Sequence, residues 1–273
     1  MTEQQERYDR IAAGYGRWWA PVLAPTAVRV LDLIDGAVAN GARRLLDLGT
    51  GTATLAVAAV RRWPSVEVTG IDASAGMLAA ARATADTTLP AADRARFLTE
   101  AAFADRLPFD DASFDAAVCS FVLQLVPSRH AALREVHRVL RQGAPFAHVT
   151  WLTGGRAFAP DAALDAALEL AGFDPREPDT RSGDYRSVDT AAAGLRRAGF
   201  RNVTAERSEL VHRFDAASYQ GFVEEFDEED TFRSMDRPTR RRVQQDLRAR
   251  LEALAPEAFE LRLPVVFARG TRP

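Results

Sequence analysis

Residues 43–56, RRLLDLGTGTATLA, constrain the fold of this chain more than any other segment. An apolar run, LLDL, is followed by a glycine turn and then by a segment of helical character. Further along, SVEVTGID supplies a second apolar run that also ends in an acidic residue, Asp72. A strand, a glycine turn, a helix and a second strand form a unit that binds adenosine-containing cofactors at the carboxyl ends of its strands. The segment therefore predicts an α/β fold with such a site.

The alternation of strands and helices continues to Trp151. We expect strands at 45–48, 66–71, 96–100, 114–119 and 146–151, and helices at 52–63, 75–85 and 129–141. Two later segments, 202–211 and 259–268, have strand character, and helical segments surround them. Short strands that alternate with helices imply a mostly parallel sheet with right-handed crossovers. We predict a Rossmann-like three-layer sandwich.

The 273 residues are consistent with one domain. We expect a helical N-terminal cap over 1–40 and a cofactor-binding core over 41–152. A helical lid with late helices and one strand follows over 153–258, and the last strand covers 259–273.

Composition excludes several classes of function. A net charge of −3 argues against a nucleic-acid partner held mainly by charge. The single cysteine, Cys119, excludes an internal disulfide and a multi-cysteine metal site. The chain has no lysine, which excludes pyridoxal enzymes and a Walker-type phosphate loop. No apolar run is long enough to span a membrane, and the polar start lacks a signal-peptide core. We expect a cytoplasmic protein, a monomer or homodimer, without a metal site.

The glycine turn alone does not identify the cofactor. A dinucleotide-binding turn has the spacing G-x-G-x-x-G, but here Gly49 and Gly51 are followed by Thr54 in the third position. Asp47 precedes the turn, where a carboxylate would crowd a pyrophosphate. A ligand with an amino group and no phosphate suits this position better. S-adenosylmethionine is such a ligand, and its sulfonium is positive.

Four segments in order resemble the class I methyltransferases of the small-molecule, ubiquinone-biosynthesis-like type. They are DLGTGTATLA, VTGIDASAGML, LPFDDASFDAAVCSFVLQLV and ALREVHRVLRQGAPFAHVTW. The opening RYDRIAAGYGRWW is similar to the N-terminal cap of this family. The resemblance covers residues 45–151 and implies a seven-stranded sheet with the last strand antiparallel. It also implies S-adenosylmethionine as the cofactor.

The resemblance implies roles for particular residues. Gly49, Thr50 and Gly51 would let the backbone pass close to the methionine part of the cofactor, with Asp47 beneath it. Asp72, followed by Ala73, would accept hydrogen bonds from both ribose hydroxyls, as a carboxylate can. The remaining contacts would be Met77 against the adenine and Ser120 beside the middle of the cofactor.

The chain departs from the family pattern on the adenine side. Relatives carry Gly-Asp-Ala before the Leu-Pro-Phe element, and this Asp accepts from the adenine amino group. Counting back from Leu107 places Phe103 in the Asp position, whereas counting from the preceding strand places Glu100 there, followed by Ala101. We favour Glu100 and Ala101, because Glu100 keeps an acceptor for the adenine.

The aromatic residues near the expected site predict an apolar or planar acceptor. Tyr8, Tyr15 and Trp19 come from the N-terminal cap, and Trp151 ends a core strand. Methyl transfer from a sulfonium needs alignment and exclusion of water more than a base. We therefore expect transfer to an O, N or C nucleophile of a small acceptor, driven mainly by proximity, and we identify no catalytic residue.

Other interpretations remain open at this stage. Asp47 and Asp72 can also be structural anions at helix N-termini, and the aromatic residues can simply cover the sheet. A protein of the same fold can bind S-adenosylmethionine without methyl transfer and serve a cyclisation or a regulatory role. A nicotinamide oxidoreductase is disfavoured by Thr54 and Asp47.

Overall fold

The computed structural model describes residues 3–155, 157–173 and 183–273. Parts of the expected lid, residues 156 and 174–182, lie outside the described residues. No helix in the described ranges is long and apolar enough to cross a membrane.

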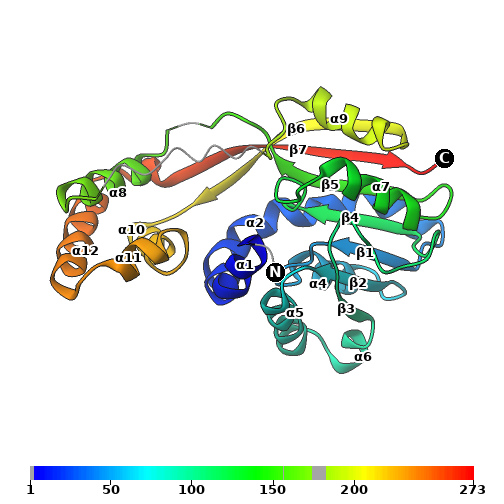
Figure 1. Cartoon of the computed structure of the whole chain (residues 1–273), viewed down its shortest axis with the longest axis horizontal. Helices are drawn as coiled ribbons and strands as arrows, with labels where there is room; N and C mark the ends of the chain where they lie inside the picture. The colour runs from blue at the N-terminus through cyan, green and yellow to red at the C-terminus, as the bar shows by residue number, and fades with distance from the viewer. Residues whose placement is uncertain (1–2, 156, 174–182) are drawn as a thin grey trace.

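A seven-stranded sheet with the order β3-β2-β1-β4-β5-β7-β6 forms the centre of the molecule (Figure 1). The strands are β1 (Arg44–Leu48), β2 (Glu67–Asp72), β3 (Phe97–Ala101), β4 (Ala116–Ser120), β5 (Pro145–Trp151), β6 (Arg201–Arg213) and β7 (Glu260–Thr271). The first five strands pair in parallel, and β7 runs antiparallel to both β5 and β6. The mostly parallel sheet with an antiparallel last strand is therefore confirmed.

Helices cover both faces of the sheet and make the sandwich three layers thick (Figure 1). The N-terminal and core helices are α1 (Glu3–Gly14), η1 (Tyr15–Trp19), α2 (Ala20–Ala27), η2 (Val28–Ile34), α3 (Asp35–Ala39), α4 (Thr54–Arg62), α5 (Ala75–Thr88), α6 (Ala91–Arg94) and α7 (Arg129–Val139). One buried cluster joins α2, η2, α4 and α5 to the sheet, and a second cluster joins α7 and α9 to its other face.

The strands are strongly apolar because helices bury both of their faces. In β5 every residue is buried, and in β4 only Ser120 is partly exposed. Parallel strands in such a position read as continuous apolar runs, which is how they could be found in the sequence. The edge strand β6 is mostly exposed and carries alternating charges, which suits an unpaired edge.

The helices that connect β6 to β7, together with α8, form an arm at the far end of these two strands (Figure 1). Its helices are α8 (Ala159–Leu170), α10 (Ala216–Phe222), η3 (Val223–Asp227), α11 (Glu229–Ser234), α12 (Arg237–Glu252) and η4 (Pro256–Phe259), while α9 (Val188–Arg197) packs on the core. The segments η1 and η3 are π-helices, which the sequence did not predict. The helices of the arm fall within the segment 153–258 for which a lid was expected, whereas α9 and β6 of that segment pack in the core. Helix α1 lies between the arm and the core (Figure 1).

Candidate active site

A pocket lies at the carboxyl ends of β1, β2 and β4, where the strand order reverses between β1 and β4. This switch point is where open α/β sheets bind ligands. The pocket encloses about 1260 Å³, including its open mouth. The residues of its "core wall" are Gly49, Thr50, Gly51, Thr52, Thr54, Leu55, Ile71, Asp72, Ala73, Ser74, Met77 and residues 102–105, 120–122 and 125–127. Those of its "cap wall" are Gln5, Tyr8, Tyr15, Ala20, Leu23 and Ala27.

The glycine turn after β1 brings backbone, without side chains, to the pocket. Gly49 has φ +71°, and a Cβ on it would lie 2.3 Å from Cγ2 of Val122. Gly51 has φ +54°, and a Cβ there would meet nothing within 4 Å. Such positive φ angles favour glycine. The Thr50 amide donates to the Ile71 carbonyl at 2.7 Å, which fixes the turn against β2.

Two carboxylates flank this turn. Asp47 is 1 % exposed, lies behind the turn, and accepts a 2.8 Å hydrogen bond from the Thr50 hydroxyl. Burial raises the pKa of Asp47 to about 7, although the Thr50 hydroxyl opposes this shift. Asp72 lines the pocket and accepts from the Gly51 amide at 3.0 Å and the Ser74 amide at 2.9 Å. Burial raises the pKa of Asp72, and these amides partly offset the rise. The two amides fix the orientation of the Asp72 carboxylate.

The loop after β3 completes the adjoining side of the core wall. Phe103, which is 43 % exposed, lines the pocket together with its neighbours Ala102, Ala104 and Asp105. The backbone of Phe103 pairs with that of Arg106 in a tight turn.

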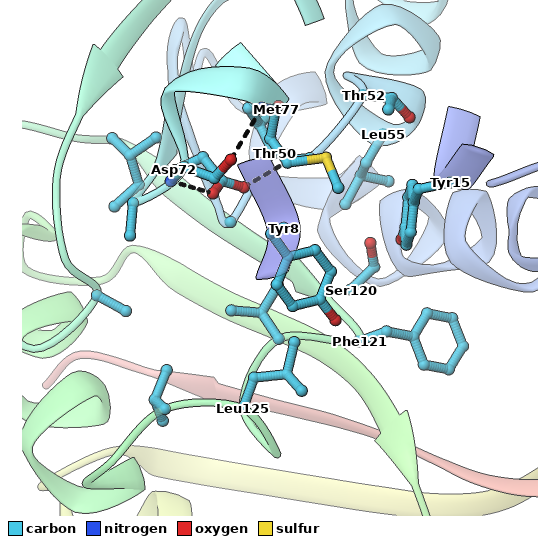
Figure 2. A pocket seen from close by; sticks show the side chains of 18 of the residues that line it. Tyr8, Tyr15, Thr50, Thr52, Leu55, Asp72, Met77, Ser120, Phe121 and Leu125 are labelled. Atoms are coloured by element: carbon cyan, nitrogen blue, oxygen red, sulfur yellow. Dashed lines mark hydrogen bonds between the residues drawn. The ribbon is translucent and has the colours of Figure 1, made fainter. Parts of the chain in front are cut away.

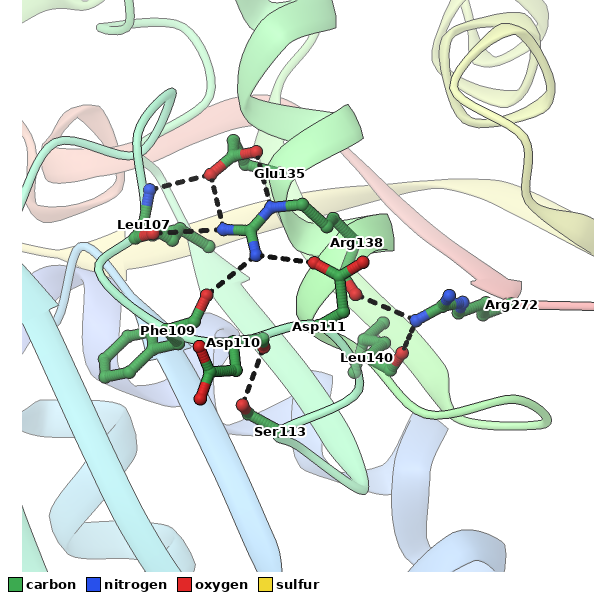
Figure 3. A network of polar contacts seen from close by, with 9 residues as sticks. All are labelled: Leu107, Phe109, Asp110, Asp111, Ser113, Glu135, Arg138, Leu140 and Arg272. Carbon is green, nitrogen blue, oxygen red and sulfur yellow. Dashed lines mark hydrogen bonds and ion pairs between the residues drawn. The ribbon is translucent and has the colours of Figure 1, made fainter.

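The Arg138 guanidinium of α7 holds the following part of this loop (Figure 3). It donates to the Phe109 carbonyl at 2.7 Å and to the Leu107 carbonyl at 3.0 Å. Glu135 accepts from Arg138 and from the Leu107 amide, both at 2.9 Å. These charge-assisted bonds fix the loop that carries the pocket residues 102–105.

The end of β4 presents a strained residue to the pocket. Phe121 has φ +55°, an uncommon conformation for a bulky residue. The Gln124 side chain donates to the Phe121 carbonyl at 2.6 Å, and the Phe121 ring lies 4.3 Å from that of Trp151. Backbone strain of this kind concentrates at functional sites.

The cap wall closes the pocket from the N-terminal side. Tyr8 of α1 lies between Asp72 and Met77 on one side and Phe121 and Leu125 on the other (Figure 2). The Tyr15 ring lies 6.2 Å from that of Tyr8 and 5.9 Å from that of Phe226 in the arm. Burial raises the pKa of Tyr15, and the charges of Tyr8 and Asp72 add to this, so its phenol stays protonated at neutral pH.

The pocket wall contains most of the residues predicted from the sequence. Of the predicted cofactor residues, it contains Gly49, Thr50, Gly51, Asp72, Ala73, Met77 and Ser120, and of the acceptor residues, Tyr8 and Tyr15. Asp47, Trp19 and Trp151 form no part of the wall. Trp151 is buried behind Phe121, and the Trp19 ring lies 6.4 Å from that of Trp151.

The pocket wall separates the two positions considered for the adenine side. Glu100 and Ala101 belong to β3 and are exposed, and neither lines the pocket. Phe103 and Ala104 line it, so the geometry favours the count back from Leu107. The residues 102–105 after β3 therefore form part of the core wall.

The sequence analysis missed the contribution of α2 and of Gln5. Ala20, Leu23 and Ala27 lie on one face of α2, and this apolar face lines the pocket. The helical spacing of these apolar residues was a usable signal. The role of Phe121 had no such signal, because its left-handed backbone follows from contacts with Gln124 and Val149.

The charge of the wall fits S-adenosylmethionine. Within the described part of the chain, the ionisable wall residues are Asp72, Asp105, Tyr8 and Tyr15, and no Arg or His lines the pocket. A cationic sulfonium suits such an acidic wall, whereas a pyrophosphate would face carboxylates without a cation. The open space beside Gly51 allows a ligand to approach the backbone closely.

Comparison with known proteins agrees with this geometry. The methyltransferase domain family matches residues 45–143. The chain is 32 % identical to a malonyl-[acyl-carrier protein] O-methyltransferase of Geobacter sulfurreducens over 78 % of this chain and 75 % of that protein. It is 39 % identical to a ubiquinone/menaquinone biosynthesis C-methyltransferase of Geobacter sp. strain M21 over 38 % of this chain and 43 % of that protein.

A solved structure shares the fold. The phosphoethanolamine N-methyltransferase 2 of Haemonchus contortus, solved with S-adenosylhomocysteine, superposes with a TM-score of 0.59 at 15 % identity. The superposition covers 100 % of this chain and 61 % of that one.

The chain belongs to the class I S-adenosylmethionine-dependent methyltransferases of the small-molecule type. It is an enzyme, and S-adenosylmethionine is its cofactor. The relatives methylate oxygen in one case and carbon in the other, so the family leaves the acceptor of this chain open.

Proposed function

We propose that this enzyme transfers a methyl group to a small, uncharged acceptor that is apolar or aromatic. The observation that carries this proposal is the absence of any Arg or His from the described pocket wall, which is otherwise mostly apolar. An anionic acceptor would find no Arg or His side chain in this wall to pair with, and the carboxylates of Asp72 and Asp105 in the same wall would disfavour it. A malonyl group, the acceptor in the name of one relative, carries such a charge.

The core wall holds the cofactor in this proposal. Gly49, Thr50 and Gly51 border its methionine part, with Asp47 behind them. Asp72 and Ala73 contact the ribose, and Ser120 the middle of the molecule. The adenine lies between Met77 and the loop of Phe103 and Ala104, in place of Glu100 and Ala101. These positions follow the wall from β2 towards the turn after β1.

The acceptor occupies the space between Tyr8, Tyr15 and Phe121. Trp151 and Trp19 support this space from behind, because the Trp151 ring packs on Phe121 and lies 6.4 Å from that of Trp19. The aromatic faces suit a planar acceptor, and a ring near a sulfonium adds a cation–π attraction.

Catalysis rests on alignment and on exclusion of water. When bound, S-adenosylmethionine supplies a methyl group that its positive sulfur already activates. The described wall offers no histidine as a general base, and the Tyr15 phenol is held protonated. The residues of the chain therefore contribute mainly by fixing the acceptor in line and keeping water out. An acceptor proton, where there is one, passes to solvent.

Turnover with acceptors of different charge tests the proposal. The purified enzyme is incubated with S-adenosylmethionine and either neutral quinols and phenols or a malonyl thioester, and S-adenosylhomocysteine is measured. We expect product with neutral aromatic acceptors and none with the malonyl thioester. Faster turnover of the malonyl thioester would refute the proposed acceptor class. If S-adenosylmethionine binds but neither the neutral nor the charged acceptors give S-adenosylhomocysteine, a cyclisation or regulatory role would be favoured.

A further inference from the structure

One face of α1 is attached to the part of the core wall that follows β2. Gln5, Tyr8 and Asp9 are spaced so that they share this face. The Gln5 amide donates to the Ala73 carbonyl at 2.8 Å, and Tyr8 lines the pocket. Asp9 accepts from the Ser74 hydroxyl at 2.6 Å and from the Gly76 amide at 2.8 Å. The same turn of helix that carries Tyr8 therefore also carries the attachment to the core.

The Asp9 contacts reach residues that line the pocket. The Ser74 hydroxyl, which donates to Asp9, also accepts from the Met77 amide at 3.0 Å and caps α5. The Ser74 amide in turn donates to Asp72. Asp9 is thus connected through Ser74, by two successive hydrogen bonds, to Asp72 and to Met77, the residues assigned to the ribose and adenine.

Charge and packing both stabilise the contact between Asp9 of α1 and the N-terminus of α5. The Asp9 carboxylate lies at the N-terminus of α5, where the helix dipole favours an anion. The Ser74 and Gly76 donors lower the pKa of Asp9, so it is ionised at neutral pH. A Cβ on Gly76 would lie 2.9 Å from the Asp9 Cα and carbonyl oxygen, so only glycine permits this approach of the two helices.

We propose that Asp9 is a positioning residue of the cofactor site, and that the contact it makes between α1 and α5 slows the release of bound cofactor. The inference rests on the proposed placement of the cofactor between Asp72, Met77 and the cap wall. We call the contact formed by Asp9, Ser74 and Gly76 the latch. While the latch is closed, Tyr8 covers this part of the pocket, so the latch sets the residence time of the cofactor.

The test is the rate of S-adenosylhomocysteine dissociation, measured by stopped-flow chase with the 273-residue protein. We expect Asp9→Ala to raise the dissociation rate constant about tenfold, since two hydrogen bonds to a charged group are lost. Asp9→Asn keeps an oxygen acceptor and should restore most of the residence time. Gly76→Ala should also speed release, although alanine favours the helix more than glycine does.

The matched control is Asp236→Ala. Asp236 caps α12 in the arm by accepting from the Thr239 amide at 2.7 Å. Its loss should lower the melting temperature as much as Asp9→Ala does and leave the dissociation rate unchanged. Equal dissociation rates in wild type, Asp9→Ala and Gly76→Ala would overturn the latch. Failure of the wild type to bind S-adenosylhomocysteine would instead overturn the proposed placement of the cofactor, and the latch with it.

Discussion

The core wall and the cap wall of the pocket are built in different ways. The core wall rests on parallel strands, on a turn in which a Cβ on Gly49 would clash with Val122, and on the Arg138 network. The outer part of the cap wall, with Gln5, Tyr8 and Tyr15, rests on α1 and η1. These helices meet the core through Asp9 and Gln5 and meet the arm through exposed pairs such as Arg17–Glu225. The inner part lies on α2, which the buried core cluster joins to the sheet. A rigid wall can hold a common cofactor, and the lightly attached outer part of the cap wall can open and vary with the acceptor.

The largest effect should come from Gly49→Ala in the core wall. The added Cβ meets Val122 at 2.3 Å, and the backbone has φ +71°. We expect a loss of about 4 kcal/mol in the free energy of unfolding, from overpacking and backbone strain together, with loss of cofactor binding. Urea unfolding checks the first and calorimetry the second.

Gly143→Ala is the control for strain alone. Gly143 has φ +80°, and its Cβ would meet nothing within 4 Å. Its replacement should cost about 1 kcal/mol and leave binding intact. If both variants lost the same free energy of unfolding, the close approach of Val122 to the turn would not contribute to the effect of Gly49→Ala.

Asp72→Ala should weaken S-adenosylhomocysteine binding about 100-fold, because charge-assisted hydrogen bonds to the ribose are lost. Calorimetric titration measures this. Asp115→Ala is the matched control. Asp115 also accepts from two backbone amides, those of Arg43 and Arg44, both at 2.9 Å, but it lies at the amino ends of the strands, away from the pocket. A similar loss of affinity in the two variants would remove the assignment of Asp72 to the ribose.

The buried Asp47 should make stability depend on pH. Burial raises its pKa from 3.8 to about 7 in the folded state, so the folded state binds its proton more tightly than the unfolded state. This contribution to stability is complete below pH 4 and is lost as pH rises to 7. Between pH 5 and 8 the loss should be at most about 3 kcal/mol.

The measurement compares wild type with Asp47→Asn by urea unfolding at both pH values. The comparison with Asp47→Asn is needed because burial also lowers the pKa of His148 to about 3, which changes stability in the opposite direction at acid pH. Both proteins contain His148, so its contribution cancels. As pH rises, the free energy of unfolding of Asp47→Asn should increase relative to that of wild type. If the difference in free energy of unfolding between the two proteins were the same at both pH values, the pKa of Asp47 would not be raised by burial behind the turn.

Arg138→Met should cost about 2 kcal/mol, because its bonds to Glu135 and to the carbonyls of Leu107 and Phe109 are lost. Thermal unfolding measures this. Arg248→Met is the control, since Arg248 pairs with Glu252 at the surface and its side chain is 71 % exposed. That change should cost under about 0.5 kcal/mol. Equal costs would argue that the loop after β3 needs no anchoring.

The smallest effect belongs to the cap wall. Glu225→Gln weakens the contacts of the arm with Arg17 at 2.7 Å and with the Trp18 indole at 2.9 Å. Because these groups are exposed, unfolding should change by less than about 1 kcal/mol. The affinity for S-adenosylhomocysteine should stay unchanged, while KM for the acceptor rises in steady-state assays. A change in cofactor affinity would mean that the two walls do not act separately.

The same division explains what the sequence could predict. The core wall has local signals: the glycines after β1, the acid that ends β2, and the apolar runs of the strands. The cap wall has few, because its geometry depends on contacts between distant segments, such as Tyr15 with Phe226. The same applies to Asp9, whose partners Ser74 and Gly76 are remote in sequence. Glu100 was preferred over Phe103 because it ends the strand directly and keeps an acceptor for the adenine. The path of the loop after β3 depends on Arg138, which is remote in sequence.

The structure of the complex with S-adenosylhomocysteine tests the central claim most directly. We predict that its ribose contacts Asp72, its adenine lies between Met77 and Phe103, and its sulfur faces the space between Tyr8 and Phe121. A ligand bound outside the core wall, or with its sulfur turned away from Tyr8 and Phe121, would contradict the account.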